Sequence, residues 1–394
     1  MSRPRFEVGQ IIRAYGSEFL SRHSRVPQVH KTFAALAACR TSRLGGHVEE
    51  CPECGRIHVS YNSCRDRHCP KCQSKEREAW IDMRKDEILP GVKYFHVVFT
   101  VPDCLHPIAL SHQALFYSCM FRSAWNTLKA FYDKKGLQGG MTSILHTWGS
   151  NLFYHPHIHC IVTGGGVDKD GVWHHLRGCK ADAKDFLFPV HALSKVFRAK
   201  FLAMLSSSLK DDNEVVPQSI RKKCFEKSWV VYSRPPAKGV SQVLEYIGRY
   251  AYRVAISNSR ILDFTSDGMV RYDWKDYKHN AVHKSMTMHA VDFLNLFSLH
   301  ILPHAFVRIR HYGILSPSNR DKLRKVQTRL GGTPVPKKRK KKTVKQICDE
   351  RGWEIGICPK CKCPMRVVEL LKPSRAPPSS VPNSRTAHSK TVFS

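Results

Sequence analysis

The stretch of sequence that decides the fold is His155-Pro-His-Ile-His-Cys-Ile-Val162. It predicts a β-strand in which the three histidines point to one face, while Ile158 and Cys160 point to the other. One face therefore presents a row of imidazoles, and the opposite face packs into a core. Because Pro156 lacks a backbone donor, we expect regular pairing to begin at His157, near a sheet edge.

Two histidines at positions i and i+2 of a strand, here His157 and His159, are a common metal-chelating pair. A third ligand usually comes from elsewhere, and His155 and His146 are both candidates. The alternative is that these histidines are satisfied packing residues. Hydrolases of the metallo-β-lactamase type also use such a pair, but they need further ligands directly downstream, where this chain has only apolar residues and a cysteine.

Patterning on both sides of this stretch predicts an α+β core over residues 90–315, because strands and helices alternate without the regular spacing of a doubly wound sheet. Two turns, at Asp168–Gly171 and Asp267–Gly268, indicate hairpins. The predicted strands are 94–102, 141–147, 155–163 and 228–232, and the predicted helices are 112–132, 192–210 and 241–256.

The predicted helix 241–256 carries an apolar stripe and a second stripe of two phenols between two guanidinium groups, formed by Tyr246, Arg249, Tyr250 and Arg253. A tyrosine hydroxyl is a poor nucleophile at neutral pH unless a cation or a metal stabilises the phenolate. Arginines supply that charge and also hold phosphodiesters. The alternative is an amphipathic helix whose tyrosines only pack.

Composition indicates a nucleic-acid partner. The 394 residues include 64 Lys and Arg but 32 Asp and Glu, which gives a formal net charge of +32. No apolar stretch approaches the length of a membrane span, and the first residues lack the apolar core of a secretory signal. We therefore expect an intracellular protein. The odd number of cysteines, 15, argues against a disulfide framework.

Two C-x-x-C pairs, Cys51 with Cys54 and Cys69 with Cys72, predict one structural zinc site, because each tight turn supplies two thiolates to a tetrahedral ion. Neighbouring Cys64, His47 and His68 are substitutes for one ligand. Arginines and lysines between the pairs favour contact with nucleic acid over a bare structural role. Residues 1–89 are therefore predicted to form a small helical, zinc-binding and DNA-binding domain.

Residues 316–394 are predicted to be a basic and largely disordered tail. Residues 320–345 hold twelve Lys or Arg and one acid. This run is typical either of a tail that binds nucleic acid or of a nuclear localisation signal. A further pair, Cys358 and Cys361, is either a degenerate knuckle or two unliganded thiols.

Four motifs in order then resemble one family. They are the stretches 60–72, 155–159 followed by Gly164-Gly-Gly166, 246–257 and 302–313. Together they are similar to the rolling-circle insertion-sequence transposases of the IS-ninety-one-like type. These proteins carry an N-terminal zinc-binding domain and an HUH single-strand endonuclease core, where U is a hydrophobic residue.

The resemblance implies an HUH-type antiparallel sheet with flanking helices, in which His157 and His159 hold Mg²⁺ or Mn²⁺ with a third ligand. It implies that Tyr250, or Tyr246, attacks single-stranded DNA at the element ends and forms a 5′-phosphotyrosyl intermediate, which drives rolling-circle transposition. A cytoplasmic, nucleoid-associated location follows. The candidate phosphate contacts are Arg249, Arg253, Arg308 and Arg310.

Two other classes of function stay open at this point. One is a non-catalytic zinc-dependent DNA-binding protein, in which the histidines and tyrosines only pack. The other is a metal-dependent nuclease that uses water as the nucleophile, so that its activity would survive the loss of both tyrosines.

Overall fold

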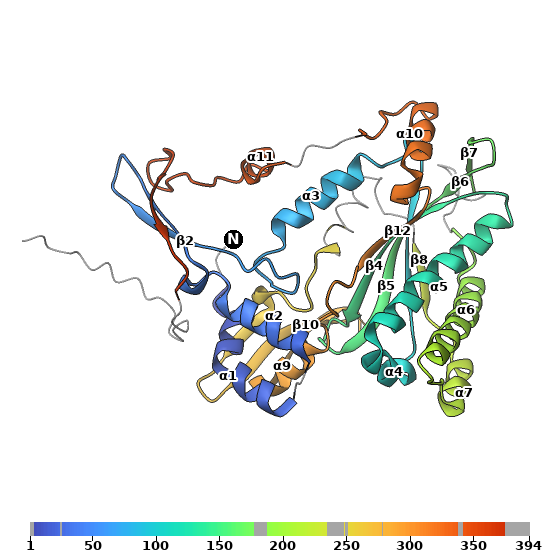
Figure 1. Cartoon of the computed structure of the whole chain (residues 1–394), viewed down its shortest axis with the longest axis horizontal. Coiled ribbons are helices and arrows are strands. Elements are labelled where there is room, and N and C mark those ends of the chain that lie inside the picture. The colour runs from blue at the N-terminus through green and yellow to red at the C-terminus, as the bar shows by residue number, and fades with distance from the viewer. Residues whose placement is uncertain are drawn as a thin grey trace, which may run out of the picture.

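The computed structural model of the chain describes residues 4–23, 26–176, 187–234, 248, 251–277, 279–337 and 342–374. Its centre is a five-stranded antiparallel sheet with the strand order β12-β4-β5-β3-β8 (Figure 1). Among the described residues no helix is both long enough and apolar enough to cross a bilayer. The five strands are β3 (Tyr94–Thr100), β4 (Gly140–Trp148), β5 (Tyr154–Thr163), β8 (Val231–Arg234) and β12 (Ile309–Gly313).

The strand β5 contains the decisive histidine stretch and lies in the middle of this sheet. It pairs with β4 from Tyr154 onward and with β3 from His157 onward. The prediction of an edge position is therefore wrong. Pro156 is tolerated in a central strand because it lies beyond the last β3 pair and beside an irregularity of β4 between His146 and Trp148.

One face of the sheet packs on a layer of helices, which Figure 1 shows on one side of the strands. The inward residues of β3 and β5, such as Phe99 and Ile158, are fully buried against aromatic side chains of the helices, such as Phe116 and Phe197. This apolar layer fixes which face the histidines take. The helices are α4 (His106–Ser111), α5 (Gln113–Asp133), α6 (Val190–Asp211) and α7 (Gln218–Glu226).

The opposite face of the sheet carries the histidines and has a different cover. Here Ile144 and Ile161 of the sheet share a buried cluster with Trp80 and Ile81 of α3 (Ser74–Lys85) and with Ala251. The helix α10 (Arg320–Arg329) adds Leu323 and Val326 to the same cluster. The α+β prediction with an antiparallel sheet and flanking helices is confirmed.

The N-terminal helices α1 (Val8–His23) and α2 (Pro27–Ala38) do not stand alone. They share a core with α9 (Ala290–Ser298), where the ring of Phe33 lies 5.3 Å from Phe19 and 6.3 Å from Phe297. The same core includes a three-stranded sheet, β9 (Ile261–Phe264), β10 (Met269–Asp276) and β11 (Val282–His289). Helices from the predicted 1–89 domain thus pack on a segment of the predicted 90–315 core.

The C-terminal segment is folded through residue 374, so the prediction of a largely disordered tail is wrong for the described part of it. After α10 and α11 (Val344–Glu350), the strand β13 (Arg366–Leu371) pairs antiparallel with β1 (Gly46–Glu50). The other neighbour of β1 is β2 (Ile57–Tyr61). Figure 1 shows this small sheet at one end of the molecule. Residues 375–394 lie outside the described residues.

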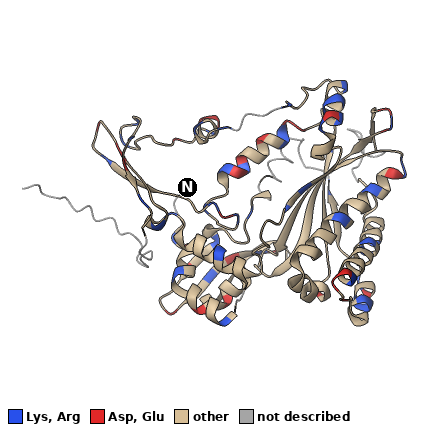
Figure 2. Cartoon of the chain, in the orientation of Figure 1, with Lys and Arg blue, Asp and Glu red and all other residues tan. Residues whose placement is uncertain are grey.

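The two predicted hairpins are confirmed. One joins β6 (Gly165–Val167) to β7 (Trp173–His175), and the other joins β9 to β10. Lys and Arg lie on the N-terminal helices as well as on α5 and α6, so the positive charge is spread over the molecule (Figure 2). The short 3-10 helices are η1 (Ser42–Leu44), η2 (Asp103–Leu105), η3 (Asn258–Arg260) and η4 (Pro317–Asn319).

Candidate active site and zinc-binding cysteines

Three histidines converge on the α3 side of the central sheet. His146 of β4 stands directly opposite His157 of β5, and His159 lies two residues further along β5. One ring nitrogen from each lies within 4.8 Å of the others. The Nε2 atoms of His157 and His159 are 3.0 Å apart. Neighbouring ligands of an octahedral ion with metal–ligand distances of about 2.1 Å lie at about this separation, so the donor set fits a metal ion.

Hydrogen bonds outside the group orient two of these rings. The Nδ1 of His157 donates to the backbone carbonyl of His155 at 2.7 Å, which leaves its Nε2 as an acceptor that faces His159. On the other side, His96 of β3 places its Nε2 2.9 Å from Nδ1 of His159. Such outer hydrogen bonds fix the tautomer and the ring orientation of metal-binding histidines.

Burial keeps His157, His159 and the neighbouring His96 uncharged at neutral pH. Desolvation lowers the pKa of His157 to about 4 and that of His96 to about 4. It also lowers the pKa of His159 well below its ordinary value, with the nearby His146 acting in the same direction. Neutral imidazoles have a free lone pair for a cation, whereas protonated ones do not. The rings are therefore ready to bind a metal ion across the physiological range.

Of the two candidates for a third ligand, His146 lies in the group with His157 and His159. His155 is exposed at the start of β5, and its ring is not part of the group. Sequence reasoning missed His96. His96 shares one face of the predicted strand 94–102 with Tyr94 and Val98. Only the register between β3 and β5 places it beside His159.

The described end of the segment predicted to carry the nucleophile packs on the histidine face, beginning at Ala251. Ala251 is fully buried against this face, and the ring of Tyr252 lies 6.5 Å from Trp80 of α3. The charge of Arg253 contributes to the lowered pKa of His159, so this guanidinium lies near the histidines. Tyr246, Arg249 and Tyr250 themselves lie outside the described residues.

Arg308 and Arg310 have structural contacts. The guanidinium of Arg308 lies 5.6 Å from the ring centre of Tyr252, and burial lowers its pKa to about 10. Arg310 pairs with Ser143 on the helix-covered side of the sheet, where it donates to Ser118 of α5 at 3.1 Å. Arg310 therefore lies on the face of the sheet opposite the histidines, and its predicted role as a phosphate contact stays a prediction.

A basic cavity borders the same segment. Its volume is about 200 Å³, and it opens between the loop before α3 and residues 252–260. Arg77, Arg253 and Arg260 line it. Arg260 donates to the carbonyls of Asp273 and Ser150, Arg77 pairs with Glu78, and Arg253 is exposed.

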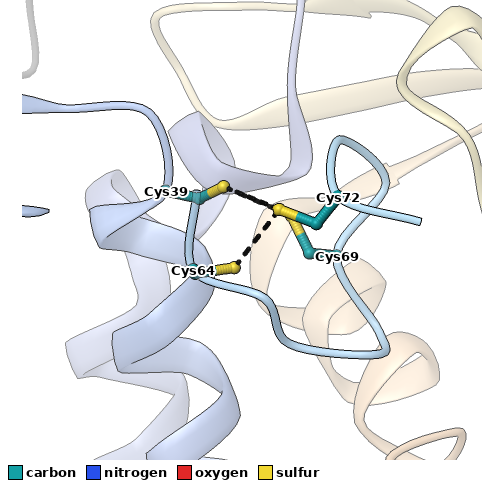
Figure 3. Close-up of side chains that lie close together, drawn as sticks. All are labelled: Cys39, Cys64, Cys69 and Cys72. Carbon is teal, nitrogen blue, oxygen red and sulfur yellow. Dashed lines mark hydrogen bonds between the residues drawn. The ribbon is translucent and has the colours of Figure 1, made fainter. Parts of the chain in front are cut away.

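Four cysteines converge between the N-terminal helices and the loop before α3 (Figure 3). Cys39 follows α2, Cys64 follows β2, and Cys69 and Cys72 come from the loop between them and α3. The Sγ of Cys72 lies 3.3 Å from that of Cys39 and 3.7 Å from that of Cys64. Hydrogen bonds from the other three thiols lower the pKa of Cys72. This donor set fits a tetrahedral zinc ion.

The predicted pairing of Cys51 and Cys54 with Cys69 and Cys72 in one site is wrong. Cys51 and Cys54 lie at the far end of the β1–β2 hairpin, in a second group with Cys358 and Cys361. The five residues of β2 span about 17 Å, which separates the two knuckles. Among the described residues, neither His47 nor His68 belongs to a cysteine group.

His68 instead docks the cysteine-bearing loop on the segment around Leu302. Its Nδ1 donates to Asp66 at 2.9 Å, and its Nε2 accepts from the backbone of Leu302 at 3.1 Å. Arg67 donates to the carbonyls of Pro303 and Phe306. These bonds account for two residues that the sequence pattern had assigned to metal binding and to DNA contact.

Comparisons with known proteins agree with this arrangement. Residues 140–323 match a family described as "Putative transposase", and residues 11–101 match one described as "Transposase zinc-binding domain". The "Putative transposase y4qJ" of Sinorhizobium fredii is 38% identical over 400 residues, which cover 96% of this chain and 98% of the relative. The "Transposase for insertion sequence element IS801" of Pseudomonas savastanoi pv. phaseolicola is 29% identical over 296 residues, which cover 73% and 70%. No solved structure matches.

Proposed function

Because this chain belongs to the IS91 family of insertion-sequence transposases, we propose that it cuts and rejoins single-stranded DNA at the element ends through a tyrosine nucleophile. One observation carries the proposal. Three imidazoles, from His146, His157 and His159, converge on the sheet face against which Ala251, the residue after Tyr250, is buried. Repeated cycles of this chemistry would drive rolling-circle transposition of the element in the bacterial cytoplasm, at the nucleoid.

The three histidines would hold Mg²⁺ or Mn²⁺. Three imidazoles leave the remaining positions of an octahedral ion to water and phosphate oxygens, which are the ligands these ions prefer. When bound, the ion would draw negative charge from the oxygens of the scissile phosphate. His96 acts as a positioning residue, because its hydrogen bond holds His159 in the orientation that points Nε2 at its neighbours.

The reaction exchanges one phosphodiester for another. The hydroxyl oxygen of Tyr250, or of Tyr246, attacks phosphorus and loses its proton, while the P–O3′ bond breaks and the 3′-oxygen takes up a proton. The products are a 5′-phosphotyrosyl enzyme and a free 3′-hydroxyl. A 3′-hydroxyl can reverse the step and rejoin a strand without ATP, because the covalent intermediate conserves the diester.

Other parts of the molecule would bind the structural zinc ion and the DNA backbone. Cys39, Cys64, Cys69 and Cys72 would bind a structural Zn²⁺, which fixes the loop before α3. Arg253 would contact the DNA backbone from the basic cavity beside the site. The formal net charge of +32 favours the approach of any nucleic acid, so the selection of single strands is a task for the site itself.

The test is covalent capture. Purified protein is mixed with end-labelled single-stranded DNA that carries the element ends, with Mg²⁺, with Mn²⁺ or with a chelator. A denaturant-resistant protein–DNA band is then measured over time. We expect a metal-dependent band that His157→Ala abolishes and that Tyr250→Phe, Tyr246→Phe or only the double variant removes.

Matched controls lie two residues from His157 and from Tyr250. His155→Ala changes a histidine of the same strand outside the group, and Tyr252→Phe changes a tyrosine that packs on Trp80; both should retain the band. Cleavage that persists without a band in the double tyrosine variant would indicate a nuclease that uses water. Binding without cleavage in any metal would indicate a DNA-binding protein.

A further inference from the structure

The second cysteine group joins the two ends of the chain. The Sγ atoms of Cys51, Cys54, Cys358 and Cys361 all lie within 4.8 Å of one another. Cys54 and Cys358 are 3.8 Å apart, although 304 positions separate them in the sequence. A tetrahedral zinc ion with Zn–S distances of about 2.3 Å places its sulfur ligands about 3.8 Å apart. The spacing is that of metal ligands, and it is far longer than the roughly 2.05 Å of a disulfide.

The backbone of the two knuckles is built in the same way. In the first, the amide of Gly55 donates to the carbonyl of Cys51, and the amide of Cys51 donates to Arg56, both at 2.9 Å. In the second, the amide of Lys362 donates to the carbonyl of Cys358, and the amide of Cys358 donates to the carbonyl of Cys363, both at 2.9 Å.

The residue after the second cysteine also matches between the knuckles. Gly55 has a φ of 66° and Lys362 a φ of 60°, so both turns use the left-handed region. Lys362 adopts this conformation against the ordinary preference of a residue with a side chain. Two loops from opposite ends of the chain thus share one turn, with all four sulfur atoms directed to one point.

A small sheet holds the two knuckles together. The first knuckle connects β1 to β2, with Glu50 paired to Ile57 at its base. The second is closed by the pair Ile357 and Pro364 and leads into β13, which pairs along β1. A three-stranded sheet with two cysteine knuckles at one end therefore forms only when both ends of the chain meet.

Ion pairs fasten the same C-terminal segment to α3. Arg351 contacts Glu78 at 2.6 Å, and Lys342 contacts Asp82 at 3.0 Å. Glu78 is buried, so its charge requires a partner. The segment that carries the second knuckle is consequently docked in a defined place before any metal binds.

We propose that Cys51, Cys54, Cys358 and Cys361 bind a second structural Zn²⁺, which closes a ribbon assembled from both ends of the chain and clamps the C-terminal segment to the N-terminal module. The chain then binds two zinc ions. Cys363, with its Sγ 3.2 Å from that of Cys51, is a fifth thiol beside the site.

The test counts zinc in the full chain, purified under reducing conditions and freed of loose metal. Elemental analysis of the wild type should give two zinc ions per chain. The variant C51S/C54S and the variant C358S/C361S/C363S change opposite ends of the sequence, yet each should retain one. Replacement of Zn²⁺ by Co²⁺ should give the absorption of tetrathiolate Co²⁺, with about half the wild-type intensity in both variants.

The control is C104S/C224S, because these two thiols also lie close together, at 3.6 Å, but belong to neither group. It should retain two zinc ions. One zinc ion per wild-type chain, or two in the C-terminal variant, would overturn the proposal. Neither readout depends on DNA cleavage, so failure of this proposal is distinguishable from failure of the nicking mechanism.

Discussion

Gly248 allows the tyrosine-bearing segment to approach α3, and its replacement by alanine tests how closely that segment must lie. A Cβ added at Gly248 would lie 2.3 Å from Cγ1 and 2.5 Å from Cδ1 of Ile81. Carbon atoms in contact lie about 3.5–4.0 Å apart, so the overlap exceeds about 1 Å. Ile81 is 4% exposed and packs in the buried cluster with Trp80 and Ala251, so it has little room to move.

We expect Gly248→Ala to displace the segment from α3 by about the overlap. Overpacking of this kind costs about 1–3 kcal/mol in the free energy of unfolding. The effect on catalysis is larger, because a misplacement of about 1 Å between reacting groups costs about 100-fold in rate. The measurement is the single-turnover rate of covalent adduct formation, with thermal unfolding followed in parallel.

Ile81→Ala removes the two atoms that the new Cβ would overlap. Alone, it leaves a cavity and should cost about 2–5 kcal/mol in the free energy of unfolding. Combined with Gly248→Ala, it should restore at least about tenfold of the lost rate, since the methyl group then has space. Wild-type activity in Gly248→Ala, or no recovery in the double variant, would refute the reasoning that the contact with α3 positions the nucleophile.

Three further predictions concern single side chains. Burial lowers the pKa of His300 to about 4, so its ring is neutral in the folded state but protonated in the unfolded chain below about pH 6.5. The free energy of unfolding should therefore fall by about 2 kcal/mol from this group as the pH drops from 7 to 5. His300→Gln, which keeps a donor for the carbonyl of Leu152, should flatten that pH dependence in urea unfolding, and an unchanged slope would contradict the assignment. His146→Ala should raise the Mn²⁺ concentration for half-maximal nicking at least about tenfold, whereas an effect equal to that of His155→Ala would remove His146 from the ligand set. Arg253→Ala should weaken binding of single-stranded DNA and lower the slope of log affinity against log salt by about 0.7, and an unaltered slope would mean that it contacts no phosphate.

Local patterns predicted the central elements because each depends on residues close together in sequence. The period-two alternation of 155–163 and the apolar run of 94–102 correspond to β5 and β3, and the predicted helix 112–132 corresponds to α5. The face of the histidines also followed from alternation alone. His96 was missed because a lone histidine on a strand has no signal of its own until the register of two strands is known.

The pairing of the cysteine knuckles was beyond local reasoning. Spacing favoured a site made by the two nearest C-x-x-C pairs, yet the hairpin directs Cys51 and Cys54 away from Cys69. Their partners at 358 and 361 come from a segment whose composition predicted disorder. A strand as exposed as β13 gains its stability from pairing with β1 and from the ion pairs of the same segment with α3, which no sequence window contains.

The position of α3 gives the zinc module a mechanical connection to the histidine face. The helix begins at Ser74, two residues after the ligand Cys72, and ends over the sheet with Trp80 and Ile81 in the cluster that also holds Ala251. The loop that bears the first cysteine group is itself fixed to the catalytic part by the bond between His68 and Leu302. The ion pairs of Glu78 and Asp82 connect the C-terminal segment to the same helix. The helix α3 thus connects the loop of the first cysteine group, the C-terminal segment and the buried cluster on the histidine face, so a change in the packing of α3 would reach all three.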